Sequence, residues 1–255
     1  MKLPPAYVRL DVGESRLFVR QEAADWARRA LSARGTLQAW ASDRPTARTL
    51  EGRGRVWDVP APVAGPDGRD RWAVRHYRRG GAVAPLLDDR YLALETPRPV
   101  QELRASEAVR ARGIPTPAVM AGAVYPVGLF YRADLVTELI PGGVDLRALL
   151  FSPGEGPDVE RAMEATGRLV RRMESAGIYH RDLNAANVLL TENGAVEAHL
   201  LDLDRCQVRE AGTPAPVGPM RDRLRRSLRK LQGQADTPLG PEVWKALKRG
   251  LGEEA

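Results

Sequence analysis

The sequence feature that most constrains the fold of this chain is the polar segment His180-Arg181-Asp182-Leu183-Asn184-Ala185-Ala186-Asn187. Residues 158–176 precede it with apolar side chains at helical spacing, and Gly177 ends that pattern. Val188-Leu189-Leu190 follows it as a short apolar run, which is typical of a buried strand. We therefore expect a long helix, a polar loop and a buried strand in direct succession.

A hairpin is expected directly after this loop. Glu192-Asn193-Gly194 is a strong turn signal between that apolar run and a second one, residues 195–201. The returning strand leads into Asp202, twenty positions after Asp182. The hairpin would therefore present the carboxylate of Asp202 back towards Asp182 and Asn187.

Two carboxylates and one carboxamide in this order suit the transfer of a phosphoryl group. One carboxylate orients the attacking hydroxyl, while two oxygen-bearing groups hold the Mg2+ ion that neutralises the phosphates of a nucleotide. The polar segment also agrees with the protein-kinase catalytic-loop pattern H-R-D-L-x-x-x-N at every fixed position. Each residue alone has a structural explanation, such as a turn aspartate at Asp182, but the three together favour catalysis.

The whole chain sets broad limits. Its 255 residues suffice for one large domain or two closely packed lobes. The single cysteine, Cys206, excludes an intrachain disulfide and fits a reducing compartment, and we expect it to be a small, partly buried side chain. Residues 1–5 lack the apolar core of a secretory signal, and the most apolar stretch, 118–131, is too short to span a bilayer. We therefore expect a cytoplasmic protein.

The first half of the chain carries the signals of a small antiparallel sheet. Gly65-Pro66-Asp67-Gly68-Arg69 is a turn between two expected strands, of which the second is 71–77. A second expected hairpin joins 117–124 to 130–139 around a glycine.

Some residues of this half are candidates for nucleotide contacts. Gly52 and Gly54 favour a glycine-rich flap, because glycines let backbone amides approach phosphate oxygens. Arg75 occupies the place of the phosphate-binding lysine of kinases and can fork onto phosphate oxygens or a carboxylate. Glu102 is the candidate ion-pair partner of Arg75, with Glu107 as the rival. An ordinary loop, a solvent-facing arginine and surface glutamates are the structural alternatives.

The segment Thr137-Glu138-Leu139-Ile140-Pro141 has the pattern of a hinge. A strand ends here, and free backbone groups of Glu138 and Ile140 are candidates to meet the edge of an adenine. A plain strand-to-helix loop is the alternative, and the residues leave both interpretations open.

The sequence after Asp202 differs from that of protein kinases. Only a Pro/Gly-rich segment, 211–219, precedes the next helix, and no A-P-E follows, which leaves little room to hold a peptide substrate. The helix expected over 220–231 has leucines on one side and six basic residues largely on the others. With the net charge of +6, this favours an acidic partner: a nucleotide, a nucleic acid or an anionic lipid surface. A core-packed helix with a solvated basic face is the alternative.

These features together resemble the 3-deoxy-D-manno-octulosonic acid (Kdo) kinases of the lipopolysaccharide kinase family. The resemblance rests on residues 74–81, 180–187 and 201–205, with further similarity at 133–137 and 225–230.

The resemblance implies an α+β, protein-kinase-like fold with two lobes. Residues 1–139 would form a sheet-rich nucleotide-binding lobe, and residues 140–255 a mainly helical catalytic lobe. ATP and Mg2+ would be bound, and the acceptor would be a hydroxyl of the Kdo sugar, taken to be the 4-position, on a Kdo-bearing lipid A precursor. The protein would then act peripherally at an anionic membrane surface, the cytoplasmic face of the bacterial inner membrane, and no nucleic-acid partner is expected.

The same resemblance implies roles for individual residues. Asp182 would be the catalytic base, and Asn187 and Asp202 would be the Mg2+ ligands. Arg75 would contact the phosphates. Asn184 stands where protein kinases usually carry a lysine, and its amide would donate a hydrogen bond to the transferring phosphate without supplying charge.

Two other interpretations stay open. The chain is alternatively a kinase of another small molecule or of a protein, although the missing A-P-E disfavours protein substrates. It is alternatively a non-catalytic nucleotide-binding protein of kinase-like shape, which the presence of Asp182, Asn187 and Asp202 disfavours.

Overall fold

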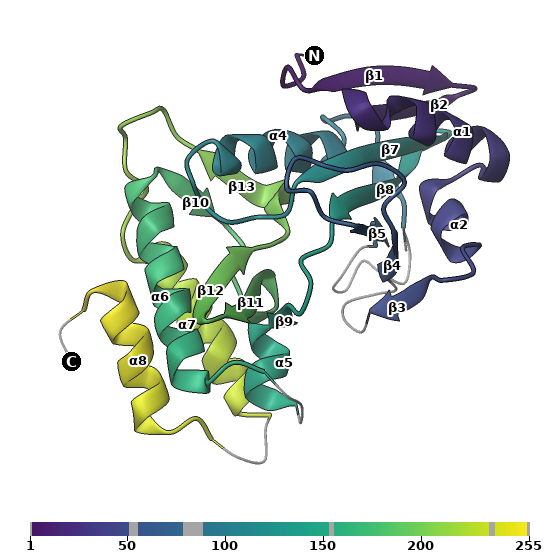
Figure 1. Ribbon diagram of the computed structural model, residues 1–255. Coiled ribbons are helices and arrows are strands. Elements are labelled where there is room, and N and C mark those ends of the chain that lie inside the picture. The colour runs from purple at the N-terminus through teal and green to yellow at the C-terminus, as the bar shows by residue number, and fades with distance from the viewer. Residues whose placement is uncertain (1, 51–55, 79–88, 153–155, 235–237, 254–255) are drawn as a thin grey trace. The chain divides into compact units, whose positions relative to one another are not determined.

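The computed structural model (Figure 1) describes residues 2–50, 56–78, 89–152, 156–234 and 238–253. The chain divides into two compact units, residues 1–107 with 117–140 and residues 108–116 with 141–255. The short stretch 108–116 is thus part of the second unit. Its attachment is explained by the hydrogen bonds from Thr116 Oγ1 to the carbonyl of Leu200, 2.7 Å, and from the Leu200 N–H to Pro115, 2.8 Å.

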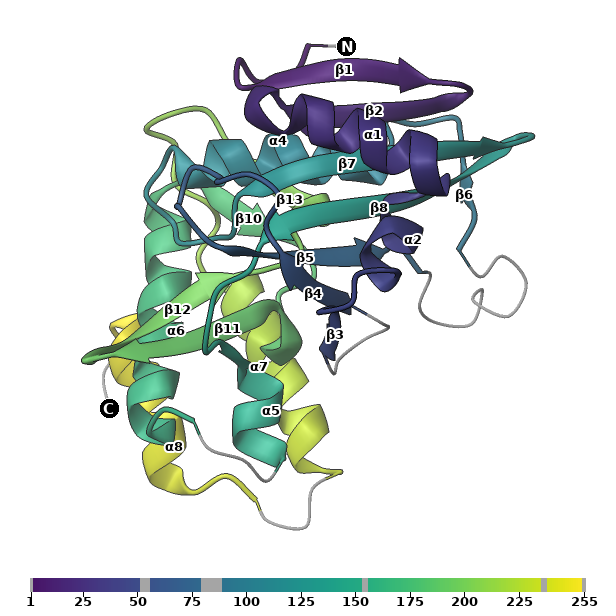
Figure 2. The same cartoon turned by 45° about the vertical axis from the view of Figure 1, so that its right-hand side comes forward.

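An antiparallel sheet forms the centre of the first unit, and Figure 2 shows its strands side by side. The strand β6 (Tyr91–Leu92) pairs with β8 but is not part of the continuous order of the other strands. The strand order of the main path is β1 (Tyr7–Val12), β2 (Ser15–Arg20), β7 (Val119–Val127), β8 (Phe130–Glu138), β5 (Arg71–His76), β4 (Val56–Pro60) and β3 (Arg48–Leu50).

Both hairpins predicted for this half of the chain are confirmed. The β4–β5 pair closes around the turn that contains Gly68, and the β7–β8 pair closes around Gly128. These two glycines have φ values of 65° and 60°, which residues with a Cβ rarely adopt. The turn chemistry therefore sets the register that places Arg75 on an inner strand, opposite Leu135 of β8.

Helices cover the two faces of this sheet. On one face lie α1 (Ala24–Arg34) and α2 (Leu37–Ser42), where Trp26 packs edge-to-face on Trp40 and Trp72 with ring centroids 4.8 and 4.7 Å apart. On the other face lies α4 (Arg98–Arg110), whose Val100 and Leu103 are completely buried. The sheet is thus packed on both sides, and polar groups on it are held in a rigid setting.

Within its described residues, the second unit combines the α-helices α5 to α8 with short strands and 3-10 helices. The expected helix over 158–176 is α6 (Val159–Ser175), capped by the side chain of Asp158, and the expected hairpin after the polar loop is β11 with β12. The bounds of the remaining elements complete the list: α5 (Leu146–Phe151), α7 (Pro219–Gln232), α8 (Pro241–Leu251), β9 (Val144–Asp145), β10 (Ile178–His180), β11 (Val188–Asn193), β12 (Ala195–Leu200) and β13 (Cys206–Val208).

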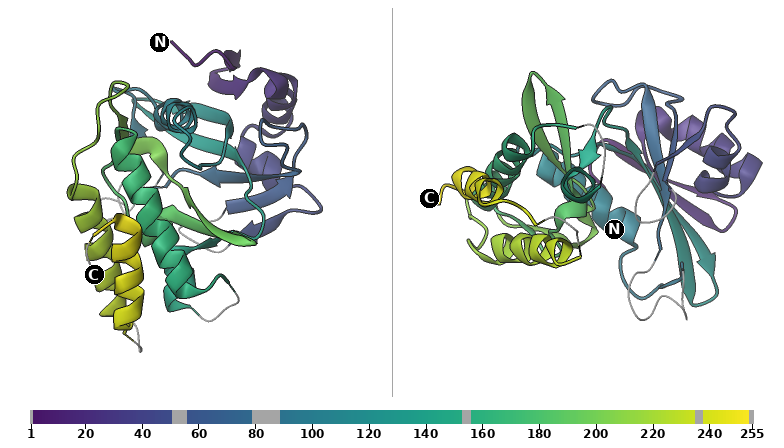
Figure 3. Two further views of the ribbon diagram at one scale, coloured as in Figure 1. Left: turned by 60° about the vertical axis from the view of Figure 1, so that its left-hand side comes forward. Right: turned by 90° about the horizontal axis from the view of Figure 1, so that it is seen from below.

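Helices α6 and α8 lie side by side, as the left view of Figure 3 shows. Glycines make this close approach possible. A Cβ at Gly167 of α6 would lie 2.6 Å from the backbone oxygen of Leu247, and one at Gly250 of α8 would collide with the backbone of Glu164. The helix α6 is therefore packed tightly against α8, and its C-terminal end leads through β10 into the polar loop.

Within the described residues, none of the helices has both the length and the apolar character that a bilayer span requires.

Candidate active site

The polar loop runs from the end of β10 through a short 3-10 helix, Ala185–Asn187, into β11. Asn184 is the N-cap of that 3-10 helix. Its Oδ1 accepts a hydrogen bond from the N–H of Ala186, 3.0 Å, and its Nδ2 donates to the carbonyl of Asp182, 2.8 Å. The Asn184 amide therefore shapes the loop, while its predicted contact with the transferring phosphate stays a prediction.

His180 joins this loop to the segment at Asp202. Its Nε2 lies 2.8 Å from the carbonyl oxygen of Asp202, and its Nδ1 lies 3.2 Å from the N–H of Asp182. A carbonyl only accepts and an N–H only donates, so Nε2 carries the proton and Nδ1 does not. The ring is buried and neutral, and its two hydrogen bonds connect the backbones of Asp182 and Asp202.

Asn187 is tied to both segments as well. Its backbone carbonyl accepts from the N–H of Leu201, 2.9 Å, and its Nδ2 donates to the carbonyl of Asp182, 3.2 Å. Because the amide nitrogen faces Asp182, the opposite side of the buried carboxamide presents the oxygen Oδ1, which is the atom type that Mg2+ binds.

Asp202 has an unusual backbone. Its φ of 60° and ψ of 65° lie in the left-handed region, and no other non-glycine residue among the described ones has a positive φ. Such a conformation costs on the order of 1–3 kcal/mol and persists only where the surroundings enforce it. The bond from His180 to the Asp202 carbonyl is one such restraint.

The carboxylate of Asp182 carries a guanidinium on each oxygen. Oδ2 lies 2.8 Å from Nη1 of Arg205, and Oδ1 lies 2.9 Å from Nη2 of Arg223. Arg205 belongs to the 3-10 helix Leu203–Arg205 that follows Asp202, and Arg223 belongs to α7. Neither arginine was predicted to meet Asp182, since both lie far from it in the sequence.

In the first unit, Arg75 forms the predicted ion pair with a glutamate. Its Nη2 lies 2.5 Å from both carboxylate oxygens of Glu102, which is buried. Tyr77 donates its hydroxyl to the same carboxylate, 2.5 Å, and the Arg75 guanidinium lies 4.8 Å from the centre of the Tyr77 ring. Tyr77 was missed as a site residue, although its position two residues after Arg75 places both on the same side of the strand.

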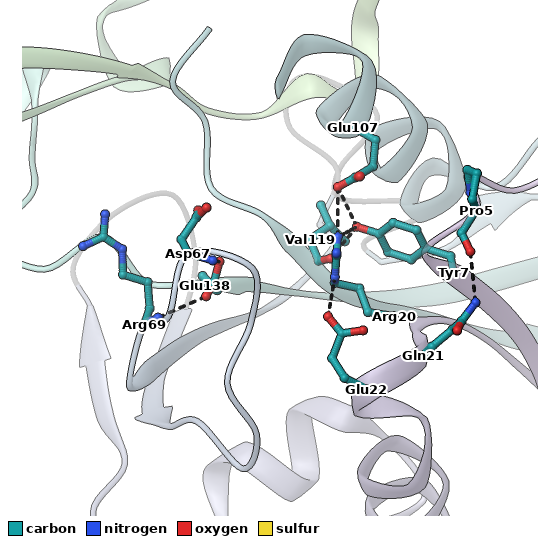
Figure 4. Close-up of polar contacts among 10 residues, drawn as sticks. All are labelled: Pro5, Tyr7, Arg20, Gln21, Glu22, Asp67, Arg69, Glu107, Val119 and Glu138. Atoms are coloured by element: carbon teal, nitrogen blue, oxygen red, sulfur yellow. Dashed lines mark hydrogen bonds and ion pairs between the residues drawn. The ribbon is translucent and has the colours of Figure 1, made fainter. Parts of the chain in front are cut away.

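Glu107, the other candidate partner of Arg75, contacts different residues. Glu107 accepts from the hydroxyl of Tyr7, 3.1 Å, and from Arg20, 3.2 Å, in a separate group (Figure 4). Burial, together with the charge of Glu107, raises the pKa of Tyr7 well above its ordinary value. The choice that the sequence left open is therefore decided in favour of Glu102.

Glu138 at the end of β8 holds the β4–β5 turn. Its carboxylate accepts from the N–H groups of Asp67 and Arg69, each 3.2 Å (Figure 4). Its own N–H donates to the carbonyl of Ala118, 2.9 Å, and the predicted contact of its backbone with adenine stays a prediction. Burial first of all, and the charge of Asp67, raise the pKa of Glu138 in spite of the two backbone hydrogen bonds.

The roles of three candidate residues remain predictions. The contact of Ile140 with adenine stays a prediction, and Gly52 and Gly54 lie outside the described residues. Burial raises the pKa of the Cys206 thiol to about 12, which keeps the thiol protonated near neutral pH.

Comparison with known proteins identifies the family. The model described as "Lipopolysaccharide kinase (Kdo/WaaP) family" matches residues 38–250. The chain belongs to the lipopolysaccharide kinase (Kdo/WaaP) family.

Curated relatives of this family agree with the assignment. The chain is 36% identical over 187 residues to a 3-deoxy-D-manno-octulosonic acid kinase of Stenotrophomonas maltophilia, which covers 72% of this chain and 69% of the relative. It is 32% identical over 193 residues to the enzyme of that name from Vibrio cholerae, covering 75% and 77%. The corresponding Photobacterium profundum protein is 32% identical over 213 residues, covering 83% and 85%.

A solved structure described as "WaaP in complex with acyl carrier protein" matches the fold with a TM-score of 0.52. It is 22% identical and covers 94% of this chain and 90% of that one. The predicted α+β, protein-kinase-like fold is confirmed. As a member of the lipopolysaccharide kinase family, the chain is a phosphotransferase that acts on a hydroxyl group.

The residues of the lipopolysaccharide kinase site fit Mg2+. The described residues contain no group of three or more His, Cys, Asp or Glu side chains that would enclose a metal ion. Mg2+ does not need such a cage, because it is usually held by one or two carboxylates together with substrate phosphates and water. One carboxamide and one carboxylate, Asn187 and Asp202, are a donor set of this kind.

Proposed function

We propose that this chain transfers the γ-phosphoryl group of ATP to a hydroxyl of the Kdo sugar, taken to be the 4-hydroxyl, on a Kdo-bearing lipid A precursor. The step belongs to the biosynthesis of the lipopolysaccharide core. The observation that carries the proposal is that the His180 ring is hydrogen-bonded to the backbones of both Asp182 and Asp202. Relatives of the chain bear the name 3-deoxy-D-manno-octulosonic acid kinase.

Each residue of the second unit has a distinct task in this proposal. Asp182 accepts a hydrogen bond from the acceptor hydroxyl and thereby orients the hydroxyl oxygen towards the γ-phosphorus atom. Asn187 and Asp202 hold Mg2+, which when bound neutralises charge on the nucleotide phosphates. His180 keeps these groups in place without taking a proton itself. Positioning of this kind lowers the barrier because the reacting groups lose little freedom in the transition state.

The first unit supplies the nucleotide contacts. Arg75, held by Glu102 and stacked on Tyr77, presents a positive charge to the phosphates. The carbonyl of Glu138 and the backbone of Ile140 serve the adenine edge, and Gly52 with Gly54 forms the flap. An arginine keeps its charge when partly buried, which suits it to replace lysine in this role.

Peripheral attachment to the cytoplasmic face of the inner membrane is part of the proposal. Three of the basic side chains of α7 bind protein carboxylates: Arg221, Arg223 and Arg225. Three others are exposed: Arg226, Arg229 and Lys230. We expect sedimentation with anionic vesicles that falls with added salt and with the replacement of these three by Gln. Equal binding to neutral and anionic vesicles would reject this attachment.

The decisive test incubates the purified protein with ATP, Mg2+ and a Kdo-bearing lipid A precursor, and measures the mass of the product. We expect the gain of one phosphate group, located on the sugar by fragmentation. Asp182→Asn keeps the shape of the side chain and should lower the rate about 10²–10⁴-fold. Asp222→Asn, an exposed carboxylate of α7, is the matched control.

Other outcomes separate the alternatives. Transfer to a different sugar or to a protein, with none to the precursor, would assign another substrate. Nucleotide binding without transfer to any acceptor in a panel would favour a non-catalytic protein. Full turnover by Asp182→Asn would remove Asp182 from the mechanism.

A further inference from the structure

The Asp182 carboxylate lies in an ion-pair cluster with Arg205 and Arg223, at 2.8 and 2.9 Å. The two guanidinium groups approach different oxygens of the carboxylate. The three side chains together carry one net positive charge. All three are partly open to solvent, with side-chain exposures of 35% for Asp182, 55% for Arg205 and 46% for Arg223. The cluster is therefore accessible to a ligand and has an excess of positive charge.

Of the polar loop residues 180–187, Arg181 is the one with a permanently charged cationic side chain, and it is exposed. Asn184 stands where protein kinases usually carry a lysine, and its side-chain amide is hydrogen-bonded to the backbones of Asp182 and Ala186 within the loop. His180 is neutral, because its ring nitrogens are shared between a carbonyl and an N–H. The guanidinium groups that bind the Asp182 carboxylate are those of Arg205 and Arg223.

The position of these arginines relates them to the acceptor. A hydroxyl oriented by Asp182 must lie within hydrogen-bond distance of a carboxylate oxygen, about 2.6–3.2 Å. The guanidinium that is bonded to the same oxygen lies within roughly 6 Å of that hydroxyl, the sum of two hydrogen bonds. The other guanidinium is bonded to the second carboxylate oxygen and is farther away by roughly 2 Å, the width of the carboxylate. A second anionic group on the same sugar is therefore within reach of both guanidiniums.

We propose that Arg205 and Arg223 recognise the carboxylate of a sugar acid, and that Asp182 occupies them until this acceptor arrives. The acceptor carboxylate takes over one or both guanidiniums, which match carboxylate geometry with paired N–H donors. The freed oxygen of Asp182 then accepts a hydrogen bond from the acceptor hydroxyl. This specificity device rests on the proposed function, and it makes the two arginines contacts of the acceptor rather than of the nucleotide.

The test compares two acceptors and four proteins. The acceptors are the Kdo-bearing precursor and the same molecule with its Kdo carboxylate converted to a carboxamide. The proteins are the wild type, Arg205→Gln, Arg223→Gln and the control Arg168→Gln. Arg168 forms an ion pair of similar exposure with Glu164, 2.6 Å, on α6. Circular dichroism and thermal unfolding establish that each variant is folded.

We expect Arg205→Gln and Arg223→Gln to raise the KM for the carboxylate acceptor about 10- to 100-fold, as loss of a charged hydrogen bond would. The KM for ATP should not rise, and the slow hydrolysis of ATP without acceptor should not fall, because loss of an arginine leaves an oxygen of Asp182 free to orient water. With the carboxamide acceptor, the variants and the wild type should differ little. Arg168→Gln should match the wild type throughout.

Equal losses with both acceptors would overturn the inference, since the arginines would then not read the carboxylate. A fall in acceptor-free ATP hydrolysis would overturn it too, because the arginines would then contact the transferring phosphoryl group. Failure of the wild type to phosphorylate the precursor is a separate result, which rejects the proposed function instead. Wild-type transfer with unaffected arginine variants rejects only the inference.

Discussion

The Nε2 atom of His180 donates a hydrogen bond to the carbonyl of Asp202, 2.8 Å away. The same ring accepts from the N–H of Asp182 through Nδ1. One neutral imidazole thereby connects the residue proposed as the base with the residue proposed as a metal ligand. It also supports the left-handed backbone of Asp202, whose φ is 60°.

His180→Leu should therefore lower kcat about 10²-fold, because a small misplacement of catalytic groups has an effect of this size. His180→Gln retains a donor near the position of Nε2 and should recover part of the loss. The measurement is steady-state kinetics on protein shown to be folded. His199→Gln is the control, since this buried histidine contacts Thr191 on β11 instead. Wild-type kcat in His180→Leu would contradict the positioning role.

The choice of Glu102 over Glu107 gives a second prediction. Glu102→Gln removes the charge that holds Arg75 and accepts from Tyr77, so ATP affinity should fall about tenfold, as expected for an interaction worth about 1.4 kcal/mol. Glu107→Gln weakens the contacts with Tyr7 and Arg20, and should affect stability but not ATP affinity. Calorimetric titration with an ATP analogue measures the difference. Equal ATP affinities in the two variants would refute the assignment.

His76 gives a pH-dependent prediction. Its Nδ1 lies 2.6 Å from Asp134 and its Nε2 lies 3.0 Å from Asp89, so both nitrogens face carboxylates. Burial lowers the pKa of His76, but the hydrogen bonds and charges of Asp134 and Asp89 outweigh it, and the pKa is raised. A raised pKa in the folded state means that this group stabilises the fold fully below the unfolded pKa of about 6.5.

The stabilisation should therefore disappear as the pH rises from about 6.5 through the raised pKa of His76. Urea unfolding from about pH 6 to 9 should show a larger stability gap between wild type and His76→Gln at the acid end. An NMR titration of the ring gives the pKa directly. A gap that grows with pH, or a ring that titrates below 6.5, would contradict the prediction.

The contact between α6 and α8 gives a fourth prediction. Gly250→Ala places a Cβ against the backbone of Glu164 and should destabilise the protein by about 1–3 kcal/mol, since packed helices must move apart. Gly240→Ala is the matched control, because no described residue other than its chain neighbours has an atom within 4 Å of a Cβ built there. Thermal unfolding measures both. An unchanged melting temperature for Gly250→Ala would show that the helices separate easily.

Local signals in the sequence were sufficient for most elements. The apolar period and the terminating Gly177 predicted α6, and the glycine turns predicted the β4–β5, β7–β8 and β11–β12 hairpins. Short elements such as α2 and α5, six residues each, were missed because they are too brief for a periodic pattern to show. Cap, turn and period act between neighbours in the chain, so neighbours are enough to predict them.

By itself, then, the sequence determined the polar loop, its chemical groups and the elements that carry it. Only the tertiary structure decided which distant side chains meet: Arg205 and Arg223 at Asp182, Glu102 rather than Glu107 at Arg75, and Asp89 with Asp134 at His76. Charged residues are numerous and equivalent in the sequence, with 39 Lys and Arg and 33 Asp and Glu. Their pairing depends on the packing of elements far apart in the chain, because an ion pair forms only where two backbones come within reach of one another.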